Sequence, residues 1–254
     1  MAKSKKAVSL FLIFTIILSA TVYYCIISKN ILNTTVLMWC PAVSAFLVKG
    51  IYYRNEKKFF WNSSYKYNVL GILIPLFYLG VSYLIFWLSR PNSLELNSLN
   101  YSLGMYLIIA ISSIISAMGE EIGWRGFLVP RLNEIFSFGK ASIISGVIWS
   151  IWHYPLIISG HYLKGAPLIY TLIIFTTEIT AMAVILSYLT LKSKGFSAAI
   201  LFHASHNFFD QIIFGPITVD KLKVYMVSET GVITCIIAII IAVICYFKAI
   251  KERL

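Results

Sequence analysis

The sequence has few charged residues: Asp, Glu, Lys and Arg make up 12% of its 254 amino acids, where soluble domains carry about 25%. Apolar residues account for 59%, and the mean hydropathy is +0.83. These values exclude an ordinary soluble domain, whose surface needs more charge, and a disordered chain, which is poor in apolar residues. Acidic residues are the scarcest, with 10 Asp and Glu against 21 Lys and Arg.

Cysteine is also scarce, and its placement excludes two kinds of site. Cys25, Cys40, Cys235 and Cys245 all lie in apolar runs, and no pair has CxxC spacing. A zinc knuckle or a disulfide framework needs closely spaced cysteines, so neither is expected. We expect four free, buried thiols that pack as small apolar side chains.

Long, nearly uncharged apolar runs dominate what is present. A helix needs about 20 residues to cross the bilayer core, where no water satisfies backbone polar groups. The runs predict an all-α, polytopic integral membrane protein with about eight transmembrane helices in one domain, residues 1–254. The expected spans are 7–28, 31–48, 69–89, 108–129, 141–158, 167–191, 196–214 and 230–247. The first run is longer than a signal-peptide core and lacks a small-x-small cleavage site, so we expect a retained anchor.

Basic residues are divided unevenly between the two ends of these spans. An even number of spans puts both termini on one side, and 16 of the 21 Lys and Arg then lie on that side. The opposite side carries Lys29, Arg90, Lys164, Lys221 and Lys223. Cytoplasmic loops hold the excess of Lys and Arg, so both termini are expected in the cytoplasm. The net charge of +11 is thus read as membrane topology, and no nucleic-acid partner is expected.

Ionisable residues inside the predicted spans are costly, so each is a functional hypothesis. Three groups stand out: Glu120, Glu121 and Arg125 in span four; Trp149 and His153 in span five; His203 and Asn207 in span seven. If the fourth helix continues until Pro130 disfavours it, the first carboxylate and the two histidines lie ~14, ~18 and ~10 Å from the cytoplasmic end. The three groups then share one depth and open towards the cytoplasm.

The two adjacent glutamates are expected to have different roles. Glu121 and Arg125 are four residues apart on one helix face, which predicts an ion pair within the helix. Glu120 points about 100° away and has no local cation. A buried carboxyl without a cation can exchange protons near neutral pH, so Glu120 is the expected general base.

One carboxylate and two imidazoles permit two mechanisms, and the spacing does not choose between them. In the first, Glu120, His153 and His203 ligate a divalent metal such as zinc. In the second, Glu120 activates water directly, with His203 and Asn207 stabilising the oxyanion. The HExxH zinc signature is absent. The cofactor is therefore either a divalent metal or none.

Four other polar residues have less specific interpretations. Glu178, alone in span six, is expected to pair with an Arg or a backbone group. Asp210 is expected to support the site or to lie at the interface. His161 is expected to be solvated in an outer loop. His206 lies off the face of His203 and is left without a role.

Taken together, the three groups resemble the CAAX-processing and bacteriocin-processing protease family, also called the Abi family. Its pattern is Glu-Glu-x-x-x-Arg, then aromatic-x-x-x-His, then His-x-x-x-Asn/Asp, and all three occur here in that order. The resemblance covers about residues 105–212 as a catalytic core, with 1–104 and 213–254 as additional membrane helices. It implies an intramembrane endopeptidase with a cavity open to the cytoplasm. It also implies that Glu120, His153 and His203 are needed for activity.

The expected function is hydrolysis of peptide bonds in hydrophobic or membrane-associated peptides, of CAAX type or in bacteriocin processing and self-immunity. Glu121, Arg125 and Asn207 are expected to hold Glu120, His153 and His203 in place. The expected partners are a peptide or membrane-protein substrate and the lipid bilayer, in a bacterial plasma membrane. Two alternatives stay open at this point: a proton-coupled transporter, which also buries Glu and His, and an inactive membrane scaffold.

Overall fold

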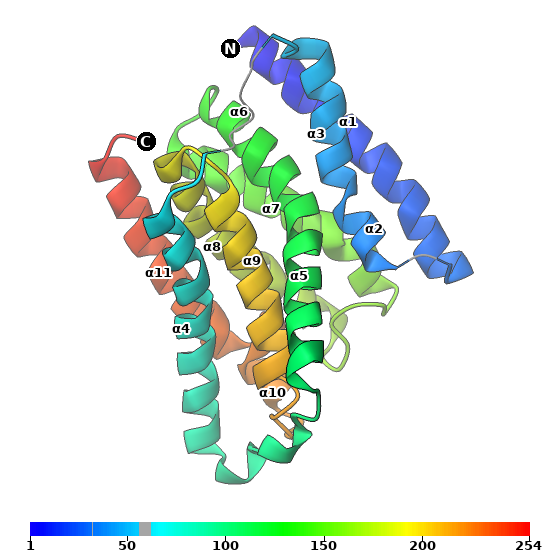
Figure 1. Ribbon diagram of the computed structural model, residues 1–254, viewed down its shortest axis with the longest axis vertical. Coiled ribbons are helices and arrows are strands. Elements are labelled where there is room, and N and C mark those ends of the chain that lie inside the picture. The colour runs from blue at the N-terminus through cyan, green and yellow to red at the C-terminus, as the bar shows by residue number, and fades with distance from the viewer. Residues whose placement is uncertain (32, 56–61) are drawn as a thin grey trace.

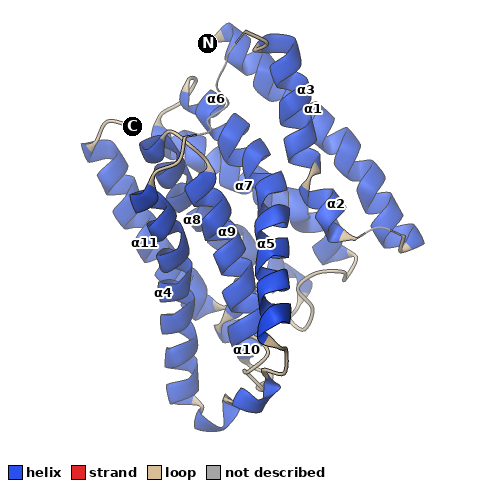
Figure 2. Cartoon of the chain, in the orientation of Figure 1, coloured by secondary structure: helices blue, strands red, loops and turns tan. Residues whose placement is uncertain are grey.

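The computed structural model describes residues 1–31, 33–55 and 62–254, and its regular structure there is helical (Figure 2). The longer α-helices are α1 (Ala2–Tyr24), α3 (Cys40–Tyr52), α4 (Tyr65–Ser89), α5 (Leu103–Gly123), α7 (Phe138–Ile158), α8 (Leu168–Ser193), α9 (Ser197–Phe208) and α11 (Val232–Lys251). The shorter ones are α2 (Thr34–Met38), α6 (Val129–Asn133) and α10 (Lys223–Met226). Three π-helical turns are η1 (Cys25–Lys29), η4 (Trp124–Leu128) and η5 (Phe209–Phe214), and three 3₁₀ turns are η2 (Pro91–Ser93), η3 (Leu96–Ser98) and η6 (Ser228–Thr230). The expected all-α class is confirmed.

Seven helical stretches of the described chain are long and apolar enough to cross a membrane. They are Ala2–Lys29, Thr34–Tyr52, Tyr65–Ser89, Leu103–Asn133, Phe138–Ile158, Leu168–Ser193 and Val232–Lys251, and they match seven of the eight expected spans. The other expected span, 196–214, forms α9 and η5 but is not among them. Its polar residues lower its hydropathy, and it packs against α4, α5 and α8.

The outward faces of the long helices are apolar, as expected for a chain surrounded by lipid. Large side chains such as Ile16 and Ile17 in α1 and Phe247 in α11 are exposed. A soluble protein rarely exposes apolar surface of this extent. The buried side chains, in contrast, include two glutamates and an arginine at one place in the chain, Glu120, Glu121 and Arg125. The chain is therefore a multi-pass integral membrane protein that buries a charged cluster within a largely apolar interior.

Figure 1 shows both chain ends at the same end of the bundle, as an even number of crossings requires, with α10 at the other end. The described lysines and arginines expected on the termini side lie in helix ends or in connections, and Lys57 and Lys58 fall outside the described residues. The cytoplasmic location of this end stays a prediction.

The fourth helical stretch does not stop where the sequence predicted. We expected it to end before Pro130, but α5 continues through the π turn η4 into α6, which ends at Asn133. Pro130 occupies the first turn of α6. Proline is tolerated there because the N–H groups in the first turn of an α-helix have no α-helical hydrogen-bond partner, so a residue without an N–H loses no such bond. The free cysteines are as expected, with Cys25 half-buried and the other three buried.

Candidate active site

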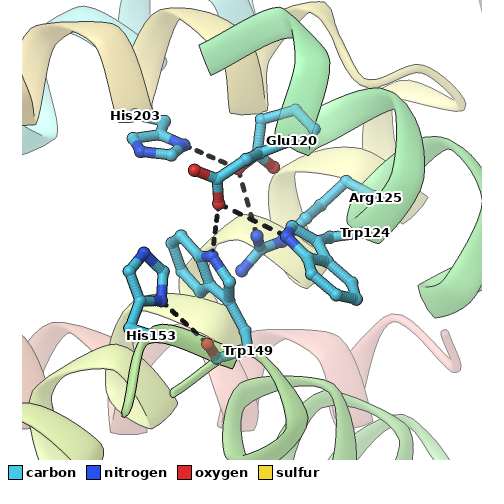
Figure 3. A network of polar contacts seen from close by, with 7 residues as sticks. Glu120, Trp124, Arg125, Trp149, His153 and His203 are labelled. Atoms are coloured by element: carbon cyan, nitrogen blue, oxygen red, sulfur yellow. Dashed lines mark hydrogen bonds and ion pairs between the residues drawn. The ribbon is translucent and has the colours of Figure 1, made fainter. Parts of the chain in front are cut away.

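Glu120 lies near the C-terminal end of α5, and two tryptophans hold its carboxylate. Only 1% of the residue is exposed. Its Oε2 accepts a hydrogen bond from the indole Nε1 of Trp149 in α7 at 2.6 Å, and a longer one from Trp124 in η4 at 3.3 Å (Figure 3). Both donors are neutral, so they orient the carboxylate without neutralising its charge.

Glu121, its neighbour, has charged partners instead. The predicted ion pair with Arg125 is confirmed: Nη1 lies 3.1 Å from Glu121 Oε1, and both side chains are fully buried. The same Oε1 accepts a hydrogen bond from Nδ1 of His203 in α9 at 2.9 Å. The second glutamate thus joins α5 to α9 and orients the His203 imidazole, a contact that its position in the sequence did not predict.

His153 is oriented by the backbone rather than by a carboxylate. Its Nδ1 lies 2.9 Å from the carbonyl oxygen of Trp149, one helical turn earlier. A carbonyl only accepts hydrogen bonds, so Nδ1 carries the proton and Nε2 is the acceptor of the neutral ring. Figure 3 shows this second nitrogen turned towards the side where Glu120 lies.

The Trp149 indole contacts both motif histidines and Arg125. Its ring centroid lies 6.0 Å from that of His153 and 5.4 Å from that of His203. The Arg125 guanidinium lies 4.0 Å from the same ring, in a cation–π contact. Trp149 was predicted as a motif position from the aromatic-x-x-x-His spacing. Its contacts with the other groups of the site were not predicted.

A cavity of about 280 Å³ adjoins these residues. Glu120, His153, His203 and Asn207 all line it, so the groups expected at one depth do share one cavity. Glu121 is not among the described residues that line it. Of the two glutamates, therefore, the one without a cationic partner is the one that faces the cavity.

The exposed members of this lining are Thr34, His161 and Gln211. Thr34 begins α2, just beyond the far end of α1, and His161 lies in the connection between α7 and α8. Because α1 starts at the N-terminus, its far end is opposite the chain termini. The cavity is thus open at the end away from the termini. The sequence predicted that the termini lie in the cytoplasm and that the cavity opens towards the cytoplasm. Because the termini and the open end of the cavity lie at opposite ends of the bundle, only one of these two predictions can be correct.

The site does not gather donors as a bound metal requires. Among the described residues, no group of three or more His, Cys, Asp or Glu side chains lies close enough to hold an ion. Glu120 accepts from two indoles, and Nδ1 of each motif histidine is bonded to another protein group. The described side chains therefore form a carboxylate and imidazole site.

Glu178 differs from expectation, and Asp210 agrees with only one of its two interpretations. Glu178 was expected to pair with an Arg or a backbone group, but it is buried and neither carboxyl oxygen has a hydrogen-bond partner among the described residues. Asp210 is not interfacial, because it is buried and accepts hydrogen bonds from Tyr83 at 2.8 Å and Ser228 at 2.6 Å. His161 lies in an exposed loop as predicted.

Sequence reasoning missed two residues of the cavity wall. Glu229 was placed in an aqueous stretch, but it is buried in η6 and lines the cavity. His206 also lines it, with Nδ1 bonded to the Tyr78 hydroxyl. A lone glutamate ahead of an apolar run carries no local signal, so only packing brings it to the site.

A fold of packed membrane helices with a buried carboxylate and imidazole site fits a polytopic membrane hydrolase. A family model described as Type II CAAX prenyl endopeptidase Rce1-like matches residues 102–209. The chain is 30% identical to CAAX prenyl protease 2 of Methanococcus maripaludis in an alignment 248 residues long, which covers 90% of this chain and 89% of that protein. It is 28% identical to lysostaphin resistance protein A of Staphylococcus haemolyticus over 184 residues, 70% of this chain and 48% of that protein.

The chain belongs to the Rce1-like family of CAAX prenyl endopeptidases. It is a peptidase of the plasma membrane of a bacterium or archaeon, and its substrates are peptides met in the membrane context.

Proposed function

We propose that the chain is an intramembrane endopeptidase in which Glu120 activates the attacking water. The observation that carries this proposal is the contrast between the two glutamates. Glu121 is paired with Arg125, whereas the hydrogen bonds that Glu120 accepts from the described residues come from indole N–H groups, and Glu120 lines the cavity with both motif histidines. A carboxylate held in this way keeps its capacity to take a proton.

The reaction then proceeds in two proton transfers. Glu120 takes a proton from a water in the cavity, and the hydroxide attacks the carbonyl carbon of the scissile peptide bond. The carbonyl oxygen becomes an oxyanion. When the C–N bond breaks, Glu120 returns the proton to the leaving amine, so the glutamate is unchanged at the end of the cycle.

The two histidines have different tasks because their Nδ1 partners differ. Glu121 supplies the counter-charge for an imidazolium at His203, whose Nε2–H then donates to the oxyanion. His153 has a carbonyl partner, so its neutral Nε2 accepts from the attacking water and orients it towards Glu120. Asn207, which lines the cavity, offers an amide N–H as a second donor to the oxyanion.

This proposal requires no metal. The observation that supports it is the absence of three gathered His, Cys, Asp or Glu donors in the part of the chain that the structure describes. A catalytic zinc would need three protein ligands and an open position for water. We therefore expect activity to survive strong chelators.

The substrates that we propose are hydrophobic or membrane-anchored peptides, with C-terminally prenylated ones to be tested first. Support comes from the archaeal relative named CAAX prenyl protease 2, which aligns over 89% of its length. A role in peptide processing and self-immunity is a second candidate, supported by the identity to a lysostaphin resistance protein.

The test uses purified full-length protein in detergent with internally quenched peptides, farnesylated and not farnesylated. Wild type is compared with Glu120→Gln, which keeps the shape of the side chain, and with Glu95→Gln, a change at an exposed glutamate. We expect Glu120→Gln to lose at least about 100-fold in kcat, Glu95→Gln to match wild type, and EDTA or 1,10-phenanthroline to have no effect. Cleavage that survives Glu120→Gln overturns the mechanism, and cleavage that chelators abolish overturns its metal-free form.

A further inference from the structure

Glu229 forms part of the cavity wall and is held there by neutral donors. It lies in η6, ahead of α11, and is 4% exposed. Its Oε1 accepts from Gln211 Nε2 at 2.9 Å, and its Oε2 accepts from the Tyr162 hydroxyl. Burial and the neighbouring carboxylate raise the pKa of the Tyr162 phenol well above its usual range, so this hydroxyl stays protonated and donates. A carboxylate has about four acceptor positions, so two stay open after these bonds.

Among the described residues, the hydrogen bonds to Glu229 come from Gln211 and Tyr162, and none comes from a basic side chain. His206 Nε2 is 3.9 Å from Glu229 Oε1, too far for a hydrogen bond. Tyr162, Gln211 and Glu229 also line a second cavity of about 390 Å³, together with Lys223. The ammonium of Lys223 donates to the carbonyl oxygens of Gly215 and Thr218, each at 2.9 Å.

The charges around the catalytic cavity are therefore unbalanced. Among the described residues that line it, two are carboxylates, Glu120 and Glu229, and none is Lys or Arg. A positive charge on His203 does not compensate them, because that imidazole is already paired with Glu121. A buried charge is normally compensated by an opposite charge, and in a low-dielectric cavity this attraction is strong. A ligand that carries a cation into the cavity would supply the compensation.

We propose that Glu229 determines specificity by binding a cationic group of the substrate, an ammonium or guanidinium close to the scissile bond. This assignment rests on the function proposed above, because it needs a peptide whose cleaved bond lies at Glu120. Both carboxylates line one small cavity, so a substrate at the first has its neighbouring residue within reach of the second. The cation is a Lys or Arg side chain or the free α-amino group of a short peptide.

The experiment measures kcat/KM for matched peptides with purified full-length protein in detergent. One apolar, internally quenched sequence carries Lys, norleucine or Glu at each position that flanks the cleaved bond. Every peptide is made with a free and with an acetylated N-terminus, which separates the two sources of positive charge. We expect wild type to prefer the cationic peptide over the norleucine peptide by about 10- to 100-fold.

The variants separate a binding role from a structural one. Glu229→Gln keeps the acceptor oxygen for Tyr162 or Gln211 but removes the charge, and we expect the preference to fall to within about 3-fold of unity. Glu229→Lys should reverse the preference towards the Glu peptide, a result that loss of structure does not produce. Glu95→Gln serves as the control and should keep the wild-type ratio.

Equal kcat/KM values for all three wild-type peptides would overturn the proposal, as would an unchanged ratio in Glu229→Gln. Failure of the proposed function has another signature, namely no cleavage by wild type or cleavage that does not depend on Glu120. In that case, equilibrium binding of the same peptides to Glu120→Gln, followed by tryptophan fluorescence, tests the role of Glu229 without the need for cleavage. Tighter binding of the cationic peptide that is lost in the Glu120→Gln/Glu229→Gln double variant supports the subsite, and equal binding of all peptides rejects it.

Discussion

The indole N–H of Trp149 lies 2.6 Å from Oε2 of Glu120, and this bond joins α7 to α5 at the wall of the catalytic cavity. The same indole contacts both motif histidines and lies beside the Arg125 guanidinium. One neutral side chain therefore contacts the proposed base, both motif histidines and Arg125. The consequences can be tested at several residues.

The two tryptophan donors provide a matched pair of substitutions. Trp149→Phe keeps an aromatic ring between the histidines but removes the 2.6 Å bond, and Trp124→Phe removes the 3.3 Å bond. A hydrogen bond to a charged group contributes about 1.5–3 kcal/mol, so we expect Trp149→Phe to lower kcat by about 10- to 100-fold. Trp124→Phe should lower it by less than about 10-fold, because a longer bond is weaker. Steady-state kinetics measure both, and an equal effect of the two would contradict the position given to Trp149.

Arg125 is expected to contribute mainly to stability. Arg125→Met leaves Glu121 buried without its cation, and breaking a buried ion pair costs about 3–5 kcal/mol. The exposed pair of Arg90 and Asp220 is the control, since such pairs contribute about 1 kcal/mol or less. Unfolding in detergent, followed by intrinsic fluorescence, should show a much lower midpoint for Arg125→Met than for Arg90→Met. Adding Glu121→Gln to the first variant should restore part of the loss, and no restoration would argue against the pair.

Helix α5 approaches α3 so closely that a single methyl group should disturb the contact. A Cβ at Gly123 would lie 2.4 Å from Pro41 Cβ and 2.6 Å from its carbonyl carbon. Overpacking of this kind costs about 1–3 kcal/mol, so Gly123→Ala should lower the free energy of unfolding by that amount. Gly80 lies within α4 with nothing inside 4 Å of such a Cβ, and Gly80→Ala should be neutral or stabilising. Equal stability of the two variants would show that the helices are not this close.

The distribution of Lys and Arg predicts how the chain is oriented in the membrane. The excess of Lys and Arg at the termini end places that end in the cytoplasm, and the open end of the cavity on the outer side. In a variant without native cysteines, Lys164→Cys should react with a membrane-impermeant maleimide on intact cells. Lys251→Cys should react only after permeabilisation. Both positions are exposed and both changes remove one lysine, so their reactivities compare directly. The reverse labelling pattern would place the cavity mouth in the cytoplasm and reject the charge rule for this chain.

Local patterns were the part of the site that could be predicted. The ion pair between Glu121 and Arg125 follows from four-residue spacing on one helix, and the structure has it. The apolar runs located seven helices by length and composition. The eighth run forms α9 and η5, whose polar residues face the cavity and reduce its hydropathy. Pro130 was read as a helix end because the π turn before it could not be anticipated from residue type.

The sequence by itself determined that the chain is an all-α membrane protein and which short motifs carry its ionisable groups, because both depend on composition and helical periodicity. Only the tertiary structure decided which residues hold the two glutamates in place, namely Trp149, 29 residues from Glu120, and His203, 82 residues from Glu121. The same holds for Glu229, which reaches the cavity wall through packing. Contacts over such separations depend on how helices approach one another, and residue spacing within one helix carries no information about that.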